Sequence, residues 1–282
     1  MRHTIATGSS TTRTSSTRRR SPTTSRPARR RKPPLWKPRR PNGPSTCHRE
    51  GLPVGEVLPA FLHGYVKARP WGAELALFVV VLVLSVLALQ GEPFSLDVPL
   101  GEAIQSWQVP LLDPILHGVS AIGWFRIAAP TTVAVVVVLG ALGWRQHAVV
   151  LGVAALTGHL FNQALKALIE RPRPEIGAER LAELGVDSFA FPSGHAQSFT
   201  IFYGFLALFI WQNVWRPWLR GLGVACMLLM IVLVGISRIY LGVHWPSDVA
   251  GAYCIGVLWL LLWTRGQSTW NNVKQQHAST SR

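Results

Sequence analysis

The sequence predicts an all-α polytopic membrane protein, a bundle of six transmembrane helices. Of its 282 residues, 49% are hydrophobic and only 15% are charged, an unusual balance for a water-soluble protein. The hydrophobic residues are clustered in runs, and several runs approach the roughly 20 residues that a helix needs to cross a bilayer. Breaks between the runs divide the chain into candidate helices joined by loops.

The six predicted spans begin with a run from Leu75 to Leu89 that only Ser85 interrupts. They are residues 73–90, 126–143, 147–169, 195–213, 220–237 and 246–264. The interval between the first two spans carries prolines at positions 99, 110 and 114 and is too interrupted to cross. Its apolar residues predict a short amphipathic helix at the membrane surface, and they are Ile115, Val119 and Ile122.

A basic tail, residues 1–70, lies ahead of the first span, and a short polar tail, residues 266–282, follows the membrane domain of residues 71–265. The N-terminal tail is rich in Ser, Thr, Pro and Arg, holds 16 of the 28 Lys and Arg residues and has no acidic residue before Glu50. It buries too little apolar surface to fold, so we expect disorder and no nucleic-acid partner. Its composition also resembles that of organellar transit peptides, which leaves a cleaved targeting segment open.

Basic residues predict the orientation, because cytoplasmic segments retain Lys and Arg. With the N-terminal tail inside, 22 of the 28 basic residues are cytoplasmic. Six tryptophans fall near the same ends of the spans: Trp71, Trp144, Trp211, Trp215, Trp218 and Trp263. We therefore expect an integral membrane protein with cytoplasmic termini, in the inner membrane of a bacterium, or in an organelle if the tail is a transit peptide.

The first of three polar clusters contains Lys166, near the end of the third span, and Arg173-Pro174. A residue before proline avoids helical geometry, so we expect the helix to end near Glu170 and an extended segment to hold Arg173. Two cations from different backbone segments could bind a phosphate. A juxtamembrane basic anchor would also explain them. Arg171, between these two cations, could assist in binding the substrate.

The second cluster, Pro192-Ser193-Gly194-His195, opens the fourth span. Ser193 is typical of a helix N-cap, and Gly194 lets the backbone approach a ligand. Helix N-termini bind anions through free amides. An ordinary transition from a loop to a helix would also explain these four residues.

The third cluster runs from Ser237-Arg238 through His244 to Asp248. Pro246 suits a first helical turn, which places Asp248 on that turn and His244 just before it. A carboxylate on one ring nitrogen would leave the other nitrogen free to attack a substrate. A capping Asp and an interfacial His remain the alternative.

All three clusters fall at one predicted membrane face, the non-cytoplasmic ends of the third to sixth spans. A separate polar stripe on the third span predicts hydrogen bonding between helices, and it consists of His159, Asn162, Gln163 and Lys166. The three cysteines, Cys47, Cys226 and Cys254, show no pairing or metal-ligand spacing. No acidic cluster is placed to hold a metal ion, so we expect neither a metal nor a cofactor.

Together the clusters resemble the signature of the type 2 phosphatidic acid phosphatase superfamily, the lipid phosphate phosphatases, over about residues 94–264. Six residues separate Lys166 from Arg173, and five separate Arg238 from His244. The resemblance implies that His244 is a nucleophile, Asp248 its orienting partner and His195 a general acid. It implies that the phosphoryl oxygens are bound by Lys166, Arg173, Ser193, Gly194 and Arg238.

The function that the resemblance implies is metal-independent hydrolysis of a lipid phosphate or pyrophosphate through a phosphohistidine. Phosphatidic acid, phosphatidylglycerophosphate and isoprenoid pyrophosphate are comparable candidates for the substrate. A lipid phosphotransferase and a non-catalytic lipid-binding or transport protein remain alternatives. Vanadium-dependent haloperoxidases have similar clusters, but those enzymes are soluble. The six predicted spans therefore argue against a haloperoxidase. The sequence does not address the oligomeric state.

Overall fold

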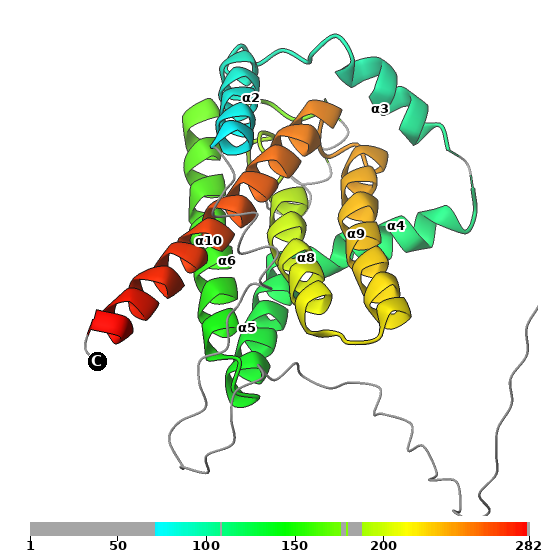
Figure 1. Cartoon of the computed structure of the whole chain (residues 1–282). Coiled ribbons are helices and arrows are strands. Elements are labelled where there is room, and N and C mark those ends of the chain that lie inside the picture. The colour runs from blue at the N-terminus through cyan, green and yellow to red at the C-terminus, as the bar shows by residue number, and fades with distance from the viewer. Residues whose placement is uncertain (1–70, 108, 176–178, 180–187, 281–282) are drawn as a thin grey trace, which may run out of the picture. The chain divides into compact units, whose positions relative to one another are not determined.

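The computed structural model describes residues 71–107, 109–175, 179 and 188–280, and the predicted N-terminal tail lies outside them. Within these residues the regular structure is entirely helical, as predicted. The helices are α2 (Gly72–Ala88), α3 (Asp97–Gln105), α4 (Leu112–Ile122), α5 (Phe125–Ala141), α6 (Arg145–Ile169), α8 (Gly194–Asn213), α9 (Pro217–Tyr240) and α10 (Pro246–Thr280) (Figure 1).

Each of the six predicted spans coincides with a helix. By length and composition α6, α9 and α10 up to Gly266 are each able to cross a membrane. The α4 and α5 helices meet the same criterion together, with a bend of 64° between them, so the described residues hold three or four candidate spans. The α2 helix is apolar but only 17 residues long. The α8 helix is less apolar, since it buries polar side chains such as Gln197 and Thr200 inside the bundle.

The helix ends near the predicted clusters follow local chemistry. The α6 helix ends at Ile169, and Glu170 takes a left-handed conformation with φ of 50°, just ahead of the Arg171-Pro172-Arg173-Pro174 segment. Ser193 occupies the N-cap position of α8, and α10 begins at Pro246. The three boundaries that the sequence predicts are confirmed.

The α8 helix lies among α6, α9 and α10, and α2 packs on α10. Glycines allow close approach between these helices. A Cβ atom on Gly256 of α10 would lie 2.5 Å from Cβ of Thr200 on α8, and one on Gly158 of α6 would collide with Ile201 of α8. Close packing of α8 against its neighbours therefore depends on residues without side chains.

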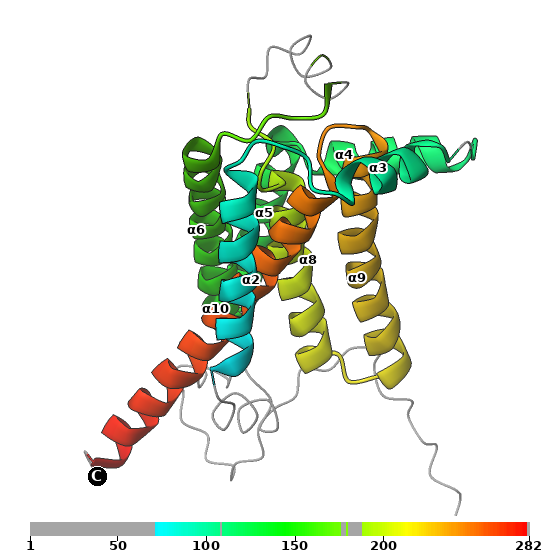
Figure 2. The same ribbon diagram turned by 90° about the horizontal axis from the view of Figure 1, so that it is seen from above.

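The short helices α3 and α4 lie across one end of the long helices, beside the α9–α10 connection (Figure 2). The short helix predicted around residues 115–122 is present as α4, which packs on α9. Leu116, Val119 and Ser120 are buried on one side, whereas Ile115 and Ile122 are exposed. This arrangement brings a small polar side chain, Ser120, into the interior at the end that holds the three polar clusters.

Candidate active site

The three predicted clusters meet around His244, which lies in the turn between α9 and α10 and is 3% exposed. Burial is the main reason that the pKa of His244 lies well below its ordinary value of 6.5. The positive charges of Arg173, Lys166 and Arg238, and then His195, lower it further. These groups come from α6, α8, α9 and the segment after α6. The structure thus brings together the cations and histidines that the sequence predicted.

Arg173 contacts His244 directly. Its Nη1 lies 3.2 Å from Nε2 of His244 and also donates to the Val243 carbonyl at 2.6 Å. Its Nε donates to the Ser188 carbonyl at 2.6 Å. Burial lowers the pKa of Arg173 to about 10, against the raising effect of Asp248, so the guanidinium is charged at neutral pH. Because a guanidinium only donates, Nε2 of His244 is the lone-pair nitrogen and the ring proton belongs on Nδ1.

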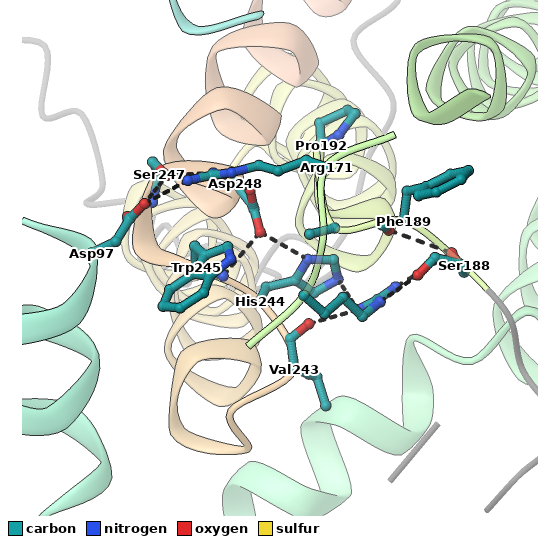
Figure 3. A network of polar contacts seen from close by, with 12 residues as sticks. Asp97, Arg171, Ser188, Phe189, Pro192, Val243, His244, Trp245, Ser247 and Asp248 are labelled. Carbon is teal, nitrogen blue, oxygen red and sulfur yellow. Dashed lines mark hydrogen bonds and ion pairs between the residues drawn. The ribbon is translucent and has the colours of Figure 1, made fainter. Parts of the chain in front are cut away.

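Asp248 faces the other side of the imidazole (Figure 3). Its Oδ2 lies 3.5 Å from Nδ1 of His244, longer than an N–H···O hydrogen bond. The same oxygen accepts the backbone N–H of Trp245 at 2.9 Å, and Oδ1 accepts Nη1 of Arg171 at 2.6 Å. The predicted pairing is present as a close approach without a hydrogen bond between the two side chains.

Lys166 and Arg173 both hold the segment that leads into α8. Nζ of Lys166, on α6, donates to the Phe189 carbonyl and, at 3.4 Å, to the Ala190 carbonyl. Of the polar stripe around Lys166, Asn162 makes the predicted bond between helices, because its Nδ2 donates to Oε1 of Gln197 at 2.8 Å. Gln163 is exposed.

The N-terminus of α8 carries the second cluster. Ser193 is fully buried, and its Oγ makes no capping bond and has no hydrogen-bond partner among the described residues. Its backbone N–H donates to the Asp248 carbonyl at 3.2 Å, which ties α8 to the first turn of α10. A Cβ atom on Gly194 would lie 3.3 Å from Oδ1 of Asn162, so glycine allows this close approach.

His195 and Arg238 share a neighbour on α4 that the sequence analysis missed. Nη1 of Arg238 donates to Oγ of Ser120, and the backbone of Ser120 lies close enough to the His195 ring to act on its charge. The His195 ring also packs against Gly123, where a Cβ atom would collide with it. The available signal was the spacing of Ser120 and Gly123, one helical turn apart at the end of α4.

A second missed group lies behind Asp248. Arg171 is fully buried, and its Nη1 and Nη2 reach Asp248 Oδ1 at 2.6 Å and Asp97 Oδ2 at 2.8 Å. Asp97, the first residue of α3, accepts Oγ and the backbone N–H of Ser247 at 2.6 and 2.8 Å. Both terminal nitrogens of Arg171 are therefore engaged by carboxylates, away from the substrate role considered for it. An acid in a mostly apolar stretch was the signal for Asp97.

A cavity of about 540 Å³ opens beside His244 and Arg173. The first turns of α3 and the residues around Trp245 form its walls, with Val98, Gly101 and Pro246 among them. The buried imidazole is thus adjacent to open space.

Comparison with known proteins decides the family. Phosphatidylglycerophosphatase B of Bacillus subtilis is 30% identical over 195 residues, which cover 67% of this chain and 91% of that protein. The chain belongs to the PAP2 superfamily. The sequence profile of the PAP2 superfamily matches residues 147–272, which include all three polar clusters, whereas Asp97 and Ser120 lie before it.

Other relatives carry the names of phosphatases of polyprenyl lipids. The decaprenylphosphoryl-5-phosphoribose phosphatase of Mycobacterium tuberculosis is 30% identical over 142 residues, 49% of this chain and 68% of that protein. The undecaprenyl-diphosphatase of Sulfolobus acidocaldarius is 25% identical over 185 residues, 64% of this chain and 84% of that protein. The crystal structure of a transmembrane PAP2-type phosphatidylglycerolphosphate phosphatase from Bacillus subtilis aligns with a TM-score of 0.56 and 28% identity, covering 68% of this chain and 94% of that one.

The chain is accordingly a membrane-embedded PAP2 lipid phosphatase, a hydrolase of phosphoric esters. Large apolar side chains exposed along the helices fit this setting, among them Phe78, Val133, Val137, Leu229 and Val232.

Proposed function

We propose that the protein removes the phosphate of a lipid phosphate through a phosphohistidine on Nε2 of His244. The observation that carries this proposal is the placement of the imidazole between Arg173, 3.2 Å from Nε2, and Asp248, 3.5 Å from Nδ1. Arg173 keeps a lone pair on Nε2, and the carboxylate favours the proton on Nδ1. The attacking nitrogen is thereby aimed at the side where a cation can hold the phosphate.

In the first step, the lone pair of Nε2 forms a bond to phosphorus while the bond from phosphorus to the lipid oxygen breaks. The leaving oxygen takes a proton from His195, so the lipid departs as an alcohol, or as a monophosphate when the substrate is a pyrophosphate. Water then attacks the phosphorus and gives a proton to His195. The N–P bond breaks, its electron pair returns to His244, and inorganic phosphate leaves.

The phosphoryl oxygens are held by Lys166, Arg173 and Arg238, together with Ser193 and Gly194 at the N-terminus of α8. Charge in the transition state spreads over three equatorial oxygens, so three cations and a helix N-terminus match it. The buried and unpartnered Oγ of Ser193 supports this role, since such a hydroxyl normally has a partner. The residues of the chain supply the positive charge, and we expect turnover without a divalent metal.

The substrate is a phosphomonoester or pyrophosphate of a glycerolipid or polyprenyl lipid, the classes that the relatives' names cover. Phosphatidylglycerophosphate, phosphatidic acid and isoprenoid pyrophosphate are the three to compare. Transfer to an acceptor alcohol other than water is the alternative reaction. A non-catalytic binding or transport protein would need neither histidine.

We further propose six spans, with cytoplasmic termini and the site at the outer ends of α6, α8, α9 and α10, in a bacterial inner membrane. A membrane domain of residues 71–265 lies between the basic tail and the polar C-terminal tail. The predicted tryptophans support this orientation, because they lie at the helix ends opposite to His244, for example Trp71 before α2 and Trp218 at the start of α9.

The test is phosphate release by purified full-length protein in detergent with excess chelator, using the three lipid classes. We expect release from at least one lipid, and none from the His244→Ala variant. Absence of turnover on all three lipids, or an active His244→Ala variant, would contradict the proposal. Adding a lipid alcohol and analysing the lipid products separates hydrolysis from transfer.

A further inference from the structure

We infer that Asp97 is a positioning residue for the reaction: it shares Arg171 with Asp248 and so leaves a net negative charge beside His244. This inference rests on the proposed role of His244 as nucleophile. It assigns a function to α3, which lies outside the part of the chain matched to the PAP2 profile.

The geometry is an arginine placed between two carboxylates. The side chains of Arg171, Asp97 and Asp248 are each at most 2% exposed, and both ion pairs are short, at 2.8 and 2.6 Å. Ser247 joins them, since its Oγ donates to Asp97 and accepts from Arg171 (Figure 3). Three charges are thus fixed together in an interior that screens them weakly.

The count of charges decides what Asp248 can do. With Asp248 as its only partner, Arg171 would cancel the carboxylate, and the pair would attract a positive ring weakly. Asp97 adds a second negative charge, so the group keeps a net charge of −1 next to Nδ1 of His244, 3.5 Å away. Phosphorylation of Nε2 leaves the ring with its Nδ1 proton and a positive charge, which this group stabilises.

The surroundings of His244 make this negative charge necessary. Lys166 of α6, Arg173, His195 of α8 and Arg238 of α9 all act on the imidazole, and each disfavours a positive ring. Asp248, on α10, is the acid that faces the ring. A neutral pair behind the imidazole would leave these cations unopposed among the described residues.

Asp97 could instead serve only to anchor α3 on α10, because it also accepts the backbone N–H of Ser247. The two roles differ in the effect of a second substitution. Asp97→Asn leaves the group neutral, Arg171→Gln leaves it at −2, and the double variant returns it to −1. If Asp97 were only an anchor, the double variant would lose more contacts than either single variant and should be less active. If its charge matters, the double variant regains the net charge of −1 and should recover activity.

The experiment measures kcat and KM of the full-length protein on the lipid that it turns over fastest. We expect Asp97→Asn to lower kcat roughly 10- to 100-fold with KM nearly unchanged, because the Asp97 side chain is only 2% exposed and its carboxylate is bonded to Arg171 and Ser247. We expect the double variant Asp97→Asn/Arg171→Gln to recover roughly tenfold in kcat relative to Asp97→Asn. Asp113→Asn, the same change at an exposed acid on α4 that does not line the cavity beside His244, is the control and should leave kcat unchanged.

The pH profile provides an independent readout. Removing a negative charge disfavours the imidazolium form, so the acid limb of kcat/KM should move to lower pH in Asp97→Asn and return in the double variant. A loss of anchoring alone would lower kcat/KM at every pH without shifting its acid limb. A double variant no more active than Asp97→Asn, with an unmoved acid limb, would overturn the inference.

Two further variants keep the outcomes distinct. If Asp97→Asn does not fold in detergent, Ser247→Ala removes a hydroxyl contact but keeps all three charges, and kcat should stay within about threefold. A loss comparable to that of His244→Ala would show that hydrogen-bond geometry matters instead of charge, against the inference. An active His244→Ala variant would refute the nucleophile assignment, whereas an inactive one with no rescue in the double variant would refute only the role of Asp97.

Discussion

Nη1 of Arg173 lies 3.2 Å from Nε2 of His244, so the proposed nucleophile has a cation on its attacking side. The contact joins two residues 71 positions apart in the chain. It exists because two prolines hold the segment after α6 in a non-helical path and a tight turn places His244 between α9 and α10. Arg173 is therefore placed to hold a phosphate next to the nitrogen that would attack it.

Substitutions of the two histidines should have different effects on turnover. We expect His244→Ala to abolish turnover, while His195→Ala slows it by roughly 10² to 10⁴, a range typical of the loss of a general acid. After mixing with a lipid that carries labelled phosphate, the wild type and His195→Ala should retain acid-labile label on the protein, and His244→Ala should retain none. Equal labelling of His244→Ala would place the phosphoenzyme on another residue.

The charge on Arg173 should set the acid limb of the pH profile. Burial, and then the positive neighbours, lower the pKa of His244, so the neutral nucleophile persists below pH 6.5. Removing one positive charge in Arg173→Gln raises that pKa, and the acid limb of kcat/KM should move to higher pH. Arg173→Lys keeps the charge and should keep the limb in place even if kcat falls. Both variants are compared on one substrate, so that its own ionisation cancels.

Ser120 should matter through Arg238. In Ser120→Ala the buried guanidinium loses its Oγ partner, and hydrogen bonds to charged groups contribute about 1.5–3 kcal/mol. We therefore expect kcat/KM to fall by roughly 10- to 100-fold. Ser106→Ala, which removes an exposed hydroxyl bonded only to a neighbouring carbonyl, is the control and should be silent. Equal effects of Ser120→Ala and Ser106→Ala would show that Ser120 does not contribute to the active site.

Close packing of α8 against α10 should be sensitive to a single methyl group. In Gly256→Ala the new Cβ atom would lie 2.5 Å from Cβ of Thr200, which no side-chain rotation can move. Overpacking of this kind costs about 1–3 kcal/mol, so thermal unfolding in detergent should occur at lower temperature. Gly140→Ala on α5 meets nothing within 4 Å and should not destabilise the protein. An unchanged unfolding temperature for Gly256→Ala would show that α10 shifts freely.

The proposed orientation predicts where a membrane-impermeant thiol reagent reacts. In a background without Cys47, Cys226 and Cys254, Glu179→Cys lies in the chain between α6 and α8 and should be labelled in intact cells. Trp215→Cys lies between α8 and α9 at the opposite end and should react only after permeabilisation. The reverse pattern would place the site in the cytoplasm.

The sequence predicted most of the helices and the members of the central cluster. Pro172, Pro174 and Pro246 mark boundaries by local sterics, which act within a few residues and can be recognised without a fold. The motif spacing identified Lys166, Arg173, His195, Arg238 and His244 for the same reason, since each spacing lies within one helix end or turn. The sequence left a substrate contact of Arg171 open; in the structure its terminal nitrogens bind Asp248 and Asp97, which lie 77 and 74 residues away, beyond the reach of local spacing.

By itself, then, the sequence determined an all-helical membrane protein, the helix ends and the local clusters, because hydrophobic runs, prolines and short spacings act through nearby residues. Only the tertiary structure decided that α3 brings Asp97 to Arg171 and that α4 brings Ser120 to Arg238. These contacts join residues 74 and 118 positions apart. Local propensity carries no information about such partners, since buried charges find them only when the helices pack.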